Sequence, residues 1–230
     1  MKKGKLFVID GTDGSGKQTQ LERLRKRLDE ENIEYKNVSF PNYESPSSSL
    51  VKMYLSGEFG QNAKEISPYI ASTFYAADRY ATYKKDIEEF YNNGGIILAD
   101  RYTTSNMIHQ AGKIKDDVER EKFLNWLFDL EFNLYGLPKP SQVFFLNMPI
   151  GISLKLMKDR ENKFSHTQEK DIHERNPKYL EESYNAACSL VGKYDWNEIK
   201  CVDENKKLKT IDEIHEEIYK VVKMELNISE

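Results

Sequence analysis

A glycine-rich loop near the N-terminus constrains the fold of this chain more than any other feature. The short apolar run at residues 6–9 leads into residues 11–17, GTDGSGK, and a leucine-rich helical pattern begins directly afterwards. This is the G-x-x-x-x-G-K arrangement, in which glycines let backbone N–H groups curl around phosphate oxygens while the lysine reaches the β/γ-phosphates. A glycine-rich structural turn is the alternative. The residues expected to bind nucleotide phosphates are Gly11, Thr12, Asp13, Gly14, Ser15, Gly16, Lys17, Gln18 and Thr19.

Short apolar runs at wide intervals predict the rest of the architecture. They lie at residues 6–9, 38–40, 96–99, 143–146 and 199–202. Because they alternate with helical patterns and show little polar alternation, we expect an α/β fold with strands buried on both faces. The prediction is a P-loop NTPase fold over residues 1–230 as one domain, with a five-stranded parallel sheet surrounded by helices and ligands at the carboxyl ends of the strands.

Helices are predicted where apolar residues recur with helical period. A further helix is expected to begin at Asn176 and Pro177, and Thr210 with Glu213 predicts a capping box. The faces expected to be buried are Leu21, Leu24 and Leu28; Ile66, Ile70, Thr73, Phe74, Ala77 and Ala81; Phe123, Leu127, Leu130 and Leu134; and Ile214, Ile218 and Val221.

Composition excludes several classes of protein. Of the 230 residues, 39% are apolar, and no apolar run approaches the roughly 20 residues that a membrane-spanning helix needs, so we expect no membrane partner. Two cysteines, Cys188 and Cys201, are too few for a disulfide framework and favour a cytoplasmic location. Since 34 basic residues nearly balance 38 acidic ones, we expect no nucleic acid polymer as partner. A small anion bound by a few local basic residues remains open.

Two aspartates are candidates for holding Mg²⁺. Gln18 stands where a Ser or Thr hydroxyl normally enters the Mg²⁺ shell, so Thr19, the Gln18 amide oxygen or water would have to replace it. Asp100 ends the apolar run at 96–99, a pattern typical of a carboxylate that holds Mg²⁺ directly or through water, although such residues also end ordinary strands. Asp13, inside the loop, is the more unusual of the two.

Three further groups suit a phosphorylated, planar ligand. Arg101 follows Asp100 and can clamp a second phosphate with its forked guanidinium; a surface ion pair is the alternative. Tyr75 and Arg79 lie one helical turn apart, where they could stack on and hydrogen-bond a base, unless they only edge an amphipathic helix. The cation-rich stretch at about 158–176 suits a lid over phosphates, or a solvated loop.

In their order and spacing, these segments resemble the thymidylate kinase family of nucleoside monophosphate kinases over nearly the whole chain. The resemblance rests on residues 9–17 (IDGTDGSGK), 40–43 (FPNY), 74–79 (FYAADR) and 100–106 (DRYTTSN). It implies that ATP, with Mg²⁺, donates its γ-phosphoryl group to dTMP as acceptor, giving dTDP and ADP in dTTP biosynthesis. We also expect a homodimer.

The resemblance also implies roles for individual residues. Lys17, Arg101, Arg160 and Asp13 would be catalytic, with Arg101 on the acceptor phosphate and Arg160 supplying charge from the lid. The residues implied in dTMP binding are Asp13, Tyr43, Phe74, Tyr75, Arg79, Arg101, Ser105, Asn106, His109 and Glu174.

Within that set the base and the sugar would be contacted by different residues. Arg79 would contact the thymine carbonyl and Asn106 its other edge. Spacing from Arg79 puts the stacking aromatic at Tyr75, although Phe74 is the residue type more often seen in the family. His109 would lie beside the deoxyribose, and Glu174 would touch the sugar or the metal shell.

The sequence departs from the family pattern in places, and other functions stay open. Asn42 and Tyr43 stand where many members have an arginine, which leaves acceptor-phosphate binding more dependent on Arg101. Gly14 stands where some members carry an arginine that others supply from the lid. The alternatives are a kinase for another nucleotide or a nucleoside, such as dUMP or thymidine, and a non-catalytic ATP-binding switch protein.

Overall fold

A parallel sheet lies at the centre of the computed structural model, which describes residues 3–62, 64–157 and 177–228. Within these residues the sheet has five strands in the order β2-β3-β1-β4-β5, and every neighbouring pair is parallel. The strands are β1 (Lys5–Asp10), β2 (Tyr35–Ser39), β3 (Ile96–Asp100), β4 (Gln142–Asn147) and β5 (Asn197–Lys200). The predicted α/β class and five-stranded parallel sheet are therefore confirmed, with strand boundaries that shift by a few residues.

Burial of the strands depends on their place in the sheet. In β1, β3 and β4 nearly every residue is buried, as predicted for strands covered on both faces. The edge strands β2 and β5 each bury only one residue fully, Val38 and Ile199. An edge strand has a neighbour on one side only, so its side chains reach solvent.

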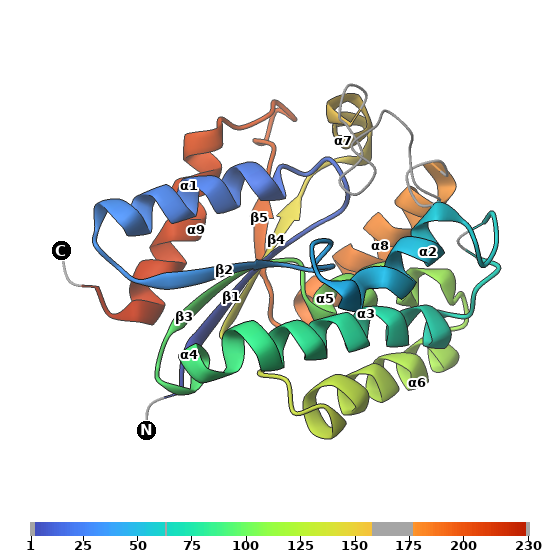
Figure 1. Cartoon of the computed structure of the whole chain (residues 1–230). Helices are drawn as coiled ribbons and strands as arrows, with labels where there is room; N and C mark the ends of the chain where they lie inside the picture. The colour runs from blue at the N-terminus through green and yellow to red at the C-terminus, as the bar shows by residue number, and fades with distance from the viewer. Residues whose placement is uncertain (1–2, 63, 158–176, 229–230) are drawn as a thin grey trace.

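Helices cover both faces of the sheet (Figure 1). On one face, α1 (Lys17–Glu30) and α9 (Ile211–Leu226) pack on β1, β3 and β4, and the predicted stripe of Leu21, Leu24 and Leu28 is buried there. The other face is covered by helical segments that contribute to a second core cluster, which includes Leu6, Val8 and Phe145 of the sheet. These are π-helical η2 (Tyr83–Ile87), α4 (Glu88–Asn92), α5 (Thr103–His109), 3₁₀-helical η3 (Ala111–Lys113), α6 (Asp117–Phe128) and α8 (Pro177–Lys193).

A third core cluster lies beside the carboxyl ends of the strands. It joins α2 (Ser49–Ser56), which follows 3₁₀-helical η1 (Pro46–Ser48), to α3 (Pro68–Thr82) and the first turn of α8. Helix α7 (Ile150–Leu156) packs at the border of this cluster, which includes Met157 just beyond it. Figure 1 shows α2, α3, α7 and α8 gathered on the right of the sheet, so the loops that leave β1 and β3 run toward this group of helices.

Helix α3 buries a different face from the predicted one. The spacing predicted that Ile70, Thr73 and Ala77 would face the core, but Ile70 is 53% exposed and Ala77 is exposed as well. The face that is buried consists of Ala71, Ser72, Ala76, Asp78, Arg79 and Thr82. The prediction was wrong because polar side chains on that face find buried partners. Asp78, for example, accepts hydrogen bonds from the Asn42 N–H (2.8 Å) and the Ser47 hydroxyl (2.5 Å).

The apolar stripe predicted for α6 is buried within the helix but not beyond its C-terminal end. Phe123 and Leu127 are buried, but Leu134 is 72% exposed. After α6 the chain makes a π-helical turn, η4 (Asp129–Leu134), in which the Tyr135 N–H donates to the Leu130 carbonyl at 2.9 Å. A π turn holds one residue more than an α turn, so the residues after it rotate away from the α-helical pattern. The extra residue carries Leu134 to the surface.

The predicted start of α9 is confirmed. Thr210 caps the helix with the reciprocal capping box, since its hydroxyl accepts from the Glu213 N–H at 3.2 Å while the Glu213 carboxylate accepts from the Thr210 N–H at 2.7 Å. Ile214 and Ile218 are buried as expected, whereas Val222 is fully buried in place of Val221. None of the helices within residues 3–62, 64–157 and 177–228 has the length and apolar character to span a bilayer.

Candidate active site

The loop between β1 and α1 has an unusual backbone and an uncapped helix start. Gly11, Gly14 and Gly16 all have positive φ angles, and Gly16 begins α1 without a side-chain cap or an acidic residue in the first turn. The hydroxyls of Thr12 and Ser15 are buried and form no hydrogen bond within the described residues. Free N–H groups at a helix start together with orphaned hydroxyls are the donors that an oxyanion requires.

Lys17 is buried at the first position of α1. Its ammonium donates to the carbonyls of Gly11 (3.0 Å) and Thr12 (2.8 Å), so it folds back over the loop. Burial, and then repulsion from Arg101, lower the pKa of Lys17 to about 7 although nearby carboxylates oppose the shift. The loop therefore contains a cation that the protein itself compensates poorly, and an anion at this place would stabilise it.

Gly14 lies against α7 and has no room for a side chain. A Cβ atom there would stand 2.5 Å from the Ser153 carbonyl oxygen and 2.7 Å from the Met157 Cγ, and the φ of +76° is one that other residues rarely adopt. An arginine at this position does not fit this packing. The close contact also joins the loop directly to the helix that precedes residues 158–176.

Asp10 and Arg101 form a buried polar group at the ends of β1 and β3. Asp10 is fully buried and accepts hydrogen bonds from the Gly11 N–H (2.8 Å), the Ser105 hydroxyl (2.9 Å) and the Thr104 hydroxyl. Arg101, with a strained φ of +66°, donates to Asp13 and to the Ser105 hydroxyl (3.3 Å). The guanidinium is thereby aimed from β3 toward the loop.

The charge of Arg101 is secured by the carboxylates around it. Burial alone would lower its pKa, but Asp13, Asp10 and Asp100 raise it above the ordinary value. His109 contributes a nitrogen, Nε2, at 3.2 Å from Arg101 Nη1. Burial, and then Arg101, lower the pKa of His109 to about 3, so the ring is neutral and accepts the guanidinium proton through Nε2.

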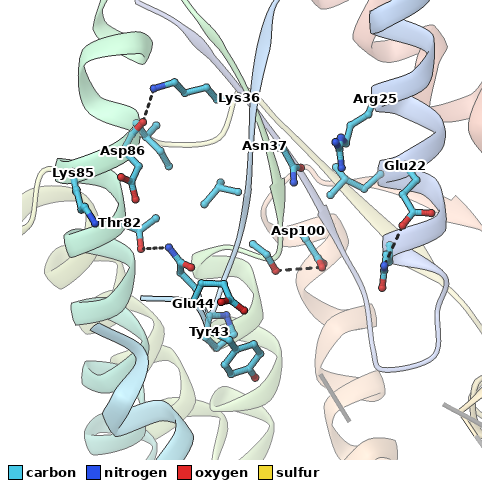
Figure 2. A pocket seen from close by; sticks show the side chains of 17 residues that line it. Glu22, Arg25, Lys36, Asn37, Tyr43, Glu44, Thr82, Lys85, Asp86 and Asp100 are labelled. Atoms are coloured by element: carbon cyan, nitrogen blue, oxygen red, sulfur yellow. Dashed lines mark hydrogen bonds between the residues drawn. The ribbon is translucent and has the colours of Figure 1, made fainter. Parts of the chain in front are cut away.

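Asp100 opens onto a cavity of about 800 Å³ on the outer side of β2. Figure 2 shows Asp100 in its wall, with Glu22 and Arg25 of α1 on one side and Thr82 on the other. The Gln18 side chain donates to Glu22 at 3.1 Å, so its amide lies along the surface of α1.

The oxygen donors present fit Mg²⁺ in its usual binding mode. Asp13 and Asp100 both lie close enough to Lys17 to raise its pKa. Within the described residues no group of three or more acidic, His or Cys side chains could form a metal site by itself. Mg²⁺ usually keeps several waters and is held by one or two carboxylates plus substrate phosphates, so two carboxylates beside a phosphate loop suffice.

Arg79 is buried between α3 and η4 and pairs with Glu131. Its Nε and Nη2 donate to the two carboxylate oxygens at 2.5 Å and 3.0 Å. The rings of Phe40 and Tyr102 each lie 5.3 Å from the guanidinium carbon. Burial alone would lower the pKa of Arg79, but the Glu131 charge and hydrogen bonds raise it, so the arginine stays charged.

The two candidate stacking aromatics are neighbours on α3, and both contact the ring of Tyr54 on α2. Phe74 packs at 5.6 Å against Phe59, on the outer side of the third core cluster. Tyr75 makes an edge contact with Tyr54 at 6.3 Å, and it lies one helical turn from both Ser72 and Arg79. Tyr75 therefore shares its face with Arg79, as the spacing predicted.

The remaining predicted residues are distributed as follows. Tyr43 lies in the β2–η1 loop, is labelled in Figure 2, and is close enough to Arg101 to influence its pKa. Asn106 lies on the buried side of α5. Arg160 and Glu174 lie outside the described residues.

Similarity to known proteins identifies the family. The profile of the family described as thymidylate kinase matches residues 9–220 of this chain. The chain belongs to the thymidylate kinase family. A thymidylate kinase from Plasmodium falciparum (isolate 3D7) is 31% identical over 150 residues, which cover 64% of this chain and 63% of that protein. The matched stretch thus spans less than two thirds of that relative.

Other thymidylate kinases match over a greater length. The one from Prochlorococcus marinus (strain NATL2A) is 26% identical over 223 residues, covering 96% of this chain and 99% of that protein. The solved structure of a thymidylate kinase from Candida albicans has a TM-score of 0.70 at 20% identity, covering 98% of this chain and 93% of that one. At that identity the structural likeness shows the fold.

Several polar residues of this thymidylate kinase fold were not singled out from the sequence. Asp10 anchors the loop and Arg101, and Glu131 pairs with Arg79. A signal was present for both. Asp10 ends an apolar strand just before the glycine loop, and Glu131 is an acidic residue one helical turn after the buried Leu127, at a position where an apolar residue is expected.

Proposed function

We propose that the chain transfers the γ-phosphoryl group of ATP to the 5′-phosphate of dTMP, forming dTDP and ADP. The family membership supports this reaction. The observation that carries it is the meeting of Lys17 and Arg101 on either side of Asp13, at the carboxyl ends of β1 and β3. Two cations around one carboxylate suit two phosphorylated ligands that must approach each other.

The loop would bind the donor phosphates. The free N–H groups of the first turn of α1 and the hydroxyls of Thr12 and Ser15 would donate to phosphate oxygens. Lys17 would turn from the carbonyls of Gly11 and Thr12 to the β/γ-phosphates. Asp13 and Asp100 would hold Mg²⁺ directly or through water, and Mg²⁺ would neutralise charge on the transferring phosphoryl group.

Arg101 would bind the acceptor phosphate. Asp13 holds one of its amino groups, and Ser105 and His109 lie against the other, so the guanidinium is fixed before the ligand arrives. Because phosphoryl transfer needs little covalent chemistry, a preorganised cation at the acceptor oxygen supplies much of the stabilisation. In the same scheme, Arg160 would add positive charge from the lid at 158–176, and Glu174 would contact the sugar or the metal shell.

The base would lie between α3 and α5. Arg79 and Asn106 would contact its polar edge, and Tyr75 would stack on it because it shares the polar face of α3. Phe74 packs on Phe59 and would support the slot from behind, while Tyr43 would border it near Arg101.

The reaction is tested by ADP release in a coupled assay with ATP, Mg²⁺ and a panel of nucleoside monophosphates and thymidine. We expect release that depends on the acceptor and is highest with dTMP. Higher release with another acceptor would reassign the substrate. Release without any acceptor, or ATP binding with no turnover, would contradict the kinase assignment and favour a hydrolase or a switch protein.

The proposal includes a homodimer that forms through the exposed face of α3. Ile70, Ala77 and Tyr80 repeat with helical period on that face and are exposed in the single chain. This exposed stripe has the spacing of a core-facing stripe, but no part of the described chain covers it. It could therefore pack against the same stripe on a second copy of the protein. Sedimentation should give a dimer that Ala77→Arg converts to monomer. A monomeric wild-type protein at micromolar concentration would contradict it.

The proposed compartment is the cytoplasm. Cys188 and Cys201 are both free thiols, and Cys201 is buried, which suits a reducing environment. Imaging of the fluorescently tagged protein tests the location.

A further inference from the structure

Glu131 is a buried carboxylate to which the proposed mechanism gives no direct contact with substrate. It lies in η4 and has no exposed surface. It accepts four hydrogen bonds from three residues: Arg79 (2.5 Å and 3.0 Å), the Thr103 hydroxyl (2.8 Å) and the Asn106 amide Nδ2 (3.4 Å). It therefore binds both residues proposed to contact the base, one from α3 and one from α5.

Stability alone does not account for a carboxylate at this position. Its position is one helical turn beyond Leu127 on the buried stripe of α6, where an apolar residue would pack at no desolvation cost. A buried ion pair is often no more stabilising than apolar residues of the same volume. Glu131 also lies in a π-helical turn, a feature frequent at functional sites.

The hydrogen bonds of Glu131 determine which atoms of its partners remain for a ligand. Two of the three guanidinium nitrogens of Arg79 are taken, and Nη1 makes no hydrogen bond within the described residues. Because a carboxylate only accepts, Asn106 must turn Nδ2 toward it, and the same Nδ2 also reaches the Ser72 carbonyl at 3.4 Å. The amide oxygen Oδ1 then faces the opposite way.

The proposed base site between α3 and α5 would thus offer a donor, Arg79 Nη1, and an acceptor, Asn106 Oδ1. Thymine and uracil carry the matching edge, with O4 as acceptor and N3–H as donor, whereas cytosine carries a 4-amino donor beside an N3 acceptor. We propose that Glu131 is a positioning residue that sets this polarity, so that the slot takes a 4-oxo pyrimidine and rejects a 4-amino pyrimidine. This inference rests on the proposed function.

The pairing also suits a neutral ligand. Glu131 balances the charge of Arg79, and the rings of Phe40 and Tyr102 pack against the guanidinium. A base then meets the Nη1 amino group of Arg79, held in place by the ion pair, and no excess charge. Without Glu131, both side chains could rotate, and Asn106 could present either its oxygen or its nitrogen.

The test is Glu131→Gln, which keeps the shape but replaces one acceptor oxygen by a donor. We expect KM for dTMP to rise about tenfold or more with kcat changed less than about threefold, and KM for ATP to change less than about twofold. The preference for dTMP over dCMP, measured as the ratio of kcat/KM values, should fall about tenfold, within the range of one bidentate base contact. A merely structural role would lower the melting temperature and the active fraction but leave KM and the ratio unchanged.

Two further variants serve as a control and as a second test of the role of Glu131. Glu119→Gln removes an exposed carboxylate of the preceding helix α6 that pairs with Lys122, and it should leave every parameter unchanged. If Glu131→Gln does not fold by circular dichroism, Thr103→Val decides. It removes the hydroxyl that donates to Glu131 Oε2, and it should shift the dTMP to dCMP ratio in the same direction by about threefold.

Calorimetric binding of dTMP and dCMP separates this inference from the proposed function. Wild-type protein that binds dTMP without turning it over would overturn the kinase assignment and still allow the Glu131 variants to be judged by binding. A wild-type enzyme that phosphorylates dTMP, with folded Glu131→Gln unchanged within about twofold in KM and in dTMP to dCMP ratio, would overturn the role of Glu131. If neither nucleotide binds the wild-type protein, both proposals fail.

Discussion

The phosphate end and the base end of the candidate site are built in different ways. The phosphate end consists mainly of consecutive residues, 11–19, whose backbone N–H groups would do most of the proposed binding. The base end joins side chains from α3, α5 and η4, and its central pair, Arg79 and Glu131, is 52 residues apart in sequence. One end is a local loop conformation, and the other exists only after three helices have packed together.

The two ends also differ in how fully the protein compensates their buried positive charges. At the phosphate end, burial lowers the pKa of Lys17 to about 7, so this cation is not fully compensated by the protein. At the base end, Glu131 raises the pKa of Arg79 and balances its charge. The phosphate end is thus completed by an anionic ligand, whereas the base end is complete by itself and suits a neutral one. Removing one partner of the buried ion pair at the base end should therefore cost stability as well as base recognition, whereas removing the cation at the phosphate end should affect mainly binding and turnover.

The largest expected effect is on stability, at the base end. Arg79→Met leaves Glu131 buried without its partner, and we expect the free energy of unfolding in urea to fall by about 3–5 kcal/mol. Adding Glu131→Leu should restore most of that loss, because an apolar pair replaces the ion pair. If Arg79→Met costs less than about 1 kcal/mol, the base end is not the self-contained unit described above.

The next effect is on turnover, at the phosphate end. Lys17→Met should lower kcat with dTMP by more than about 10²-fold, as expected for loss of a preorganised donor, with little loss of stability because a desolvated cation is removed. Arg101→Ala should act similarly. Lys113 offers a matched control, since it is also buried, has a pKa lowered to about 7 and donates to the Tyr54 hydroxyl at 2.9 Å. Near-normal turnover in Lys17→Met, or an equal loss in Lys113→Met, would contradict the assignment.

The same contrast explains what could be predicted from the sequence. The loop, its strand and its helix follow one another along the chain, so local pattern was sufficient for β1, α1 and residues 11–17. The central strands were predictable because an apolar run covered on both faces has few alternatives. Arg79 was singled out by its spacing from Tyr75 and Asn106 by the resemblance, but no sequence pattern pairs Arg79 with Glu131.

The failed predictions have two physical causes, and neither is visible in the apolar pattern. The stripe expected on α3 was inferred from apolarity alone, yet the helix buries Ser72, Asp78 and Arg79 because their partners lie on other elements. Leu134 was misplaced because no local pattern signals the extra residue of the π turn. Whether a polar side chain is buried depends on partners that are distant in sequence. The periodicity of apolar residues contains no information about those partners.

The smallest expected effect is a pH dependence confined to the phosphate end. Lys17 must be protonated to bind phosphate, and its pKa in the free protein is about 7. ADP affinity should therefore change little below about pH 6.5 and fall by up to tenfold per unit above about pH 8, because binding then requires proton uptake. His109, whose pKa is about 3, stays neutral throughout and adds nothing. Calorimetry in buffers of different ionisation enthalpy measures the proton taken up directly.

Matched variants decide whether Lys17 is the group that titrates. In Lys17→Arg the guanidinium stays protonated between about pH 7 and 9. The ADP affinity of this variant should therefore not depend on pH in that range, even if it is lower than that of the wild type. Lys113→Met should retain the wild-type pH profile, because its ammonium bonds Tyr54 and lies outside the loop. dTMP binding in the absence of ADP should show a weaker dependence, since the base end carries a balanced charge. A wild-type ADP affinity that does not vary up to about pH 9 would mean that the loop compensates Lys17 as fully as Glu131 compensates Arg79, and the contrast between the two ends would then lie in geometry alone.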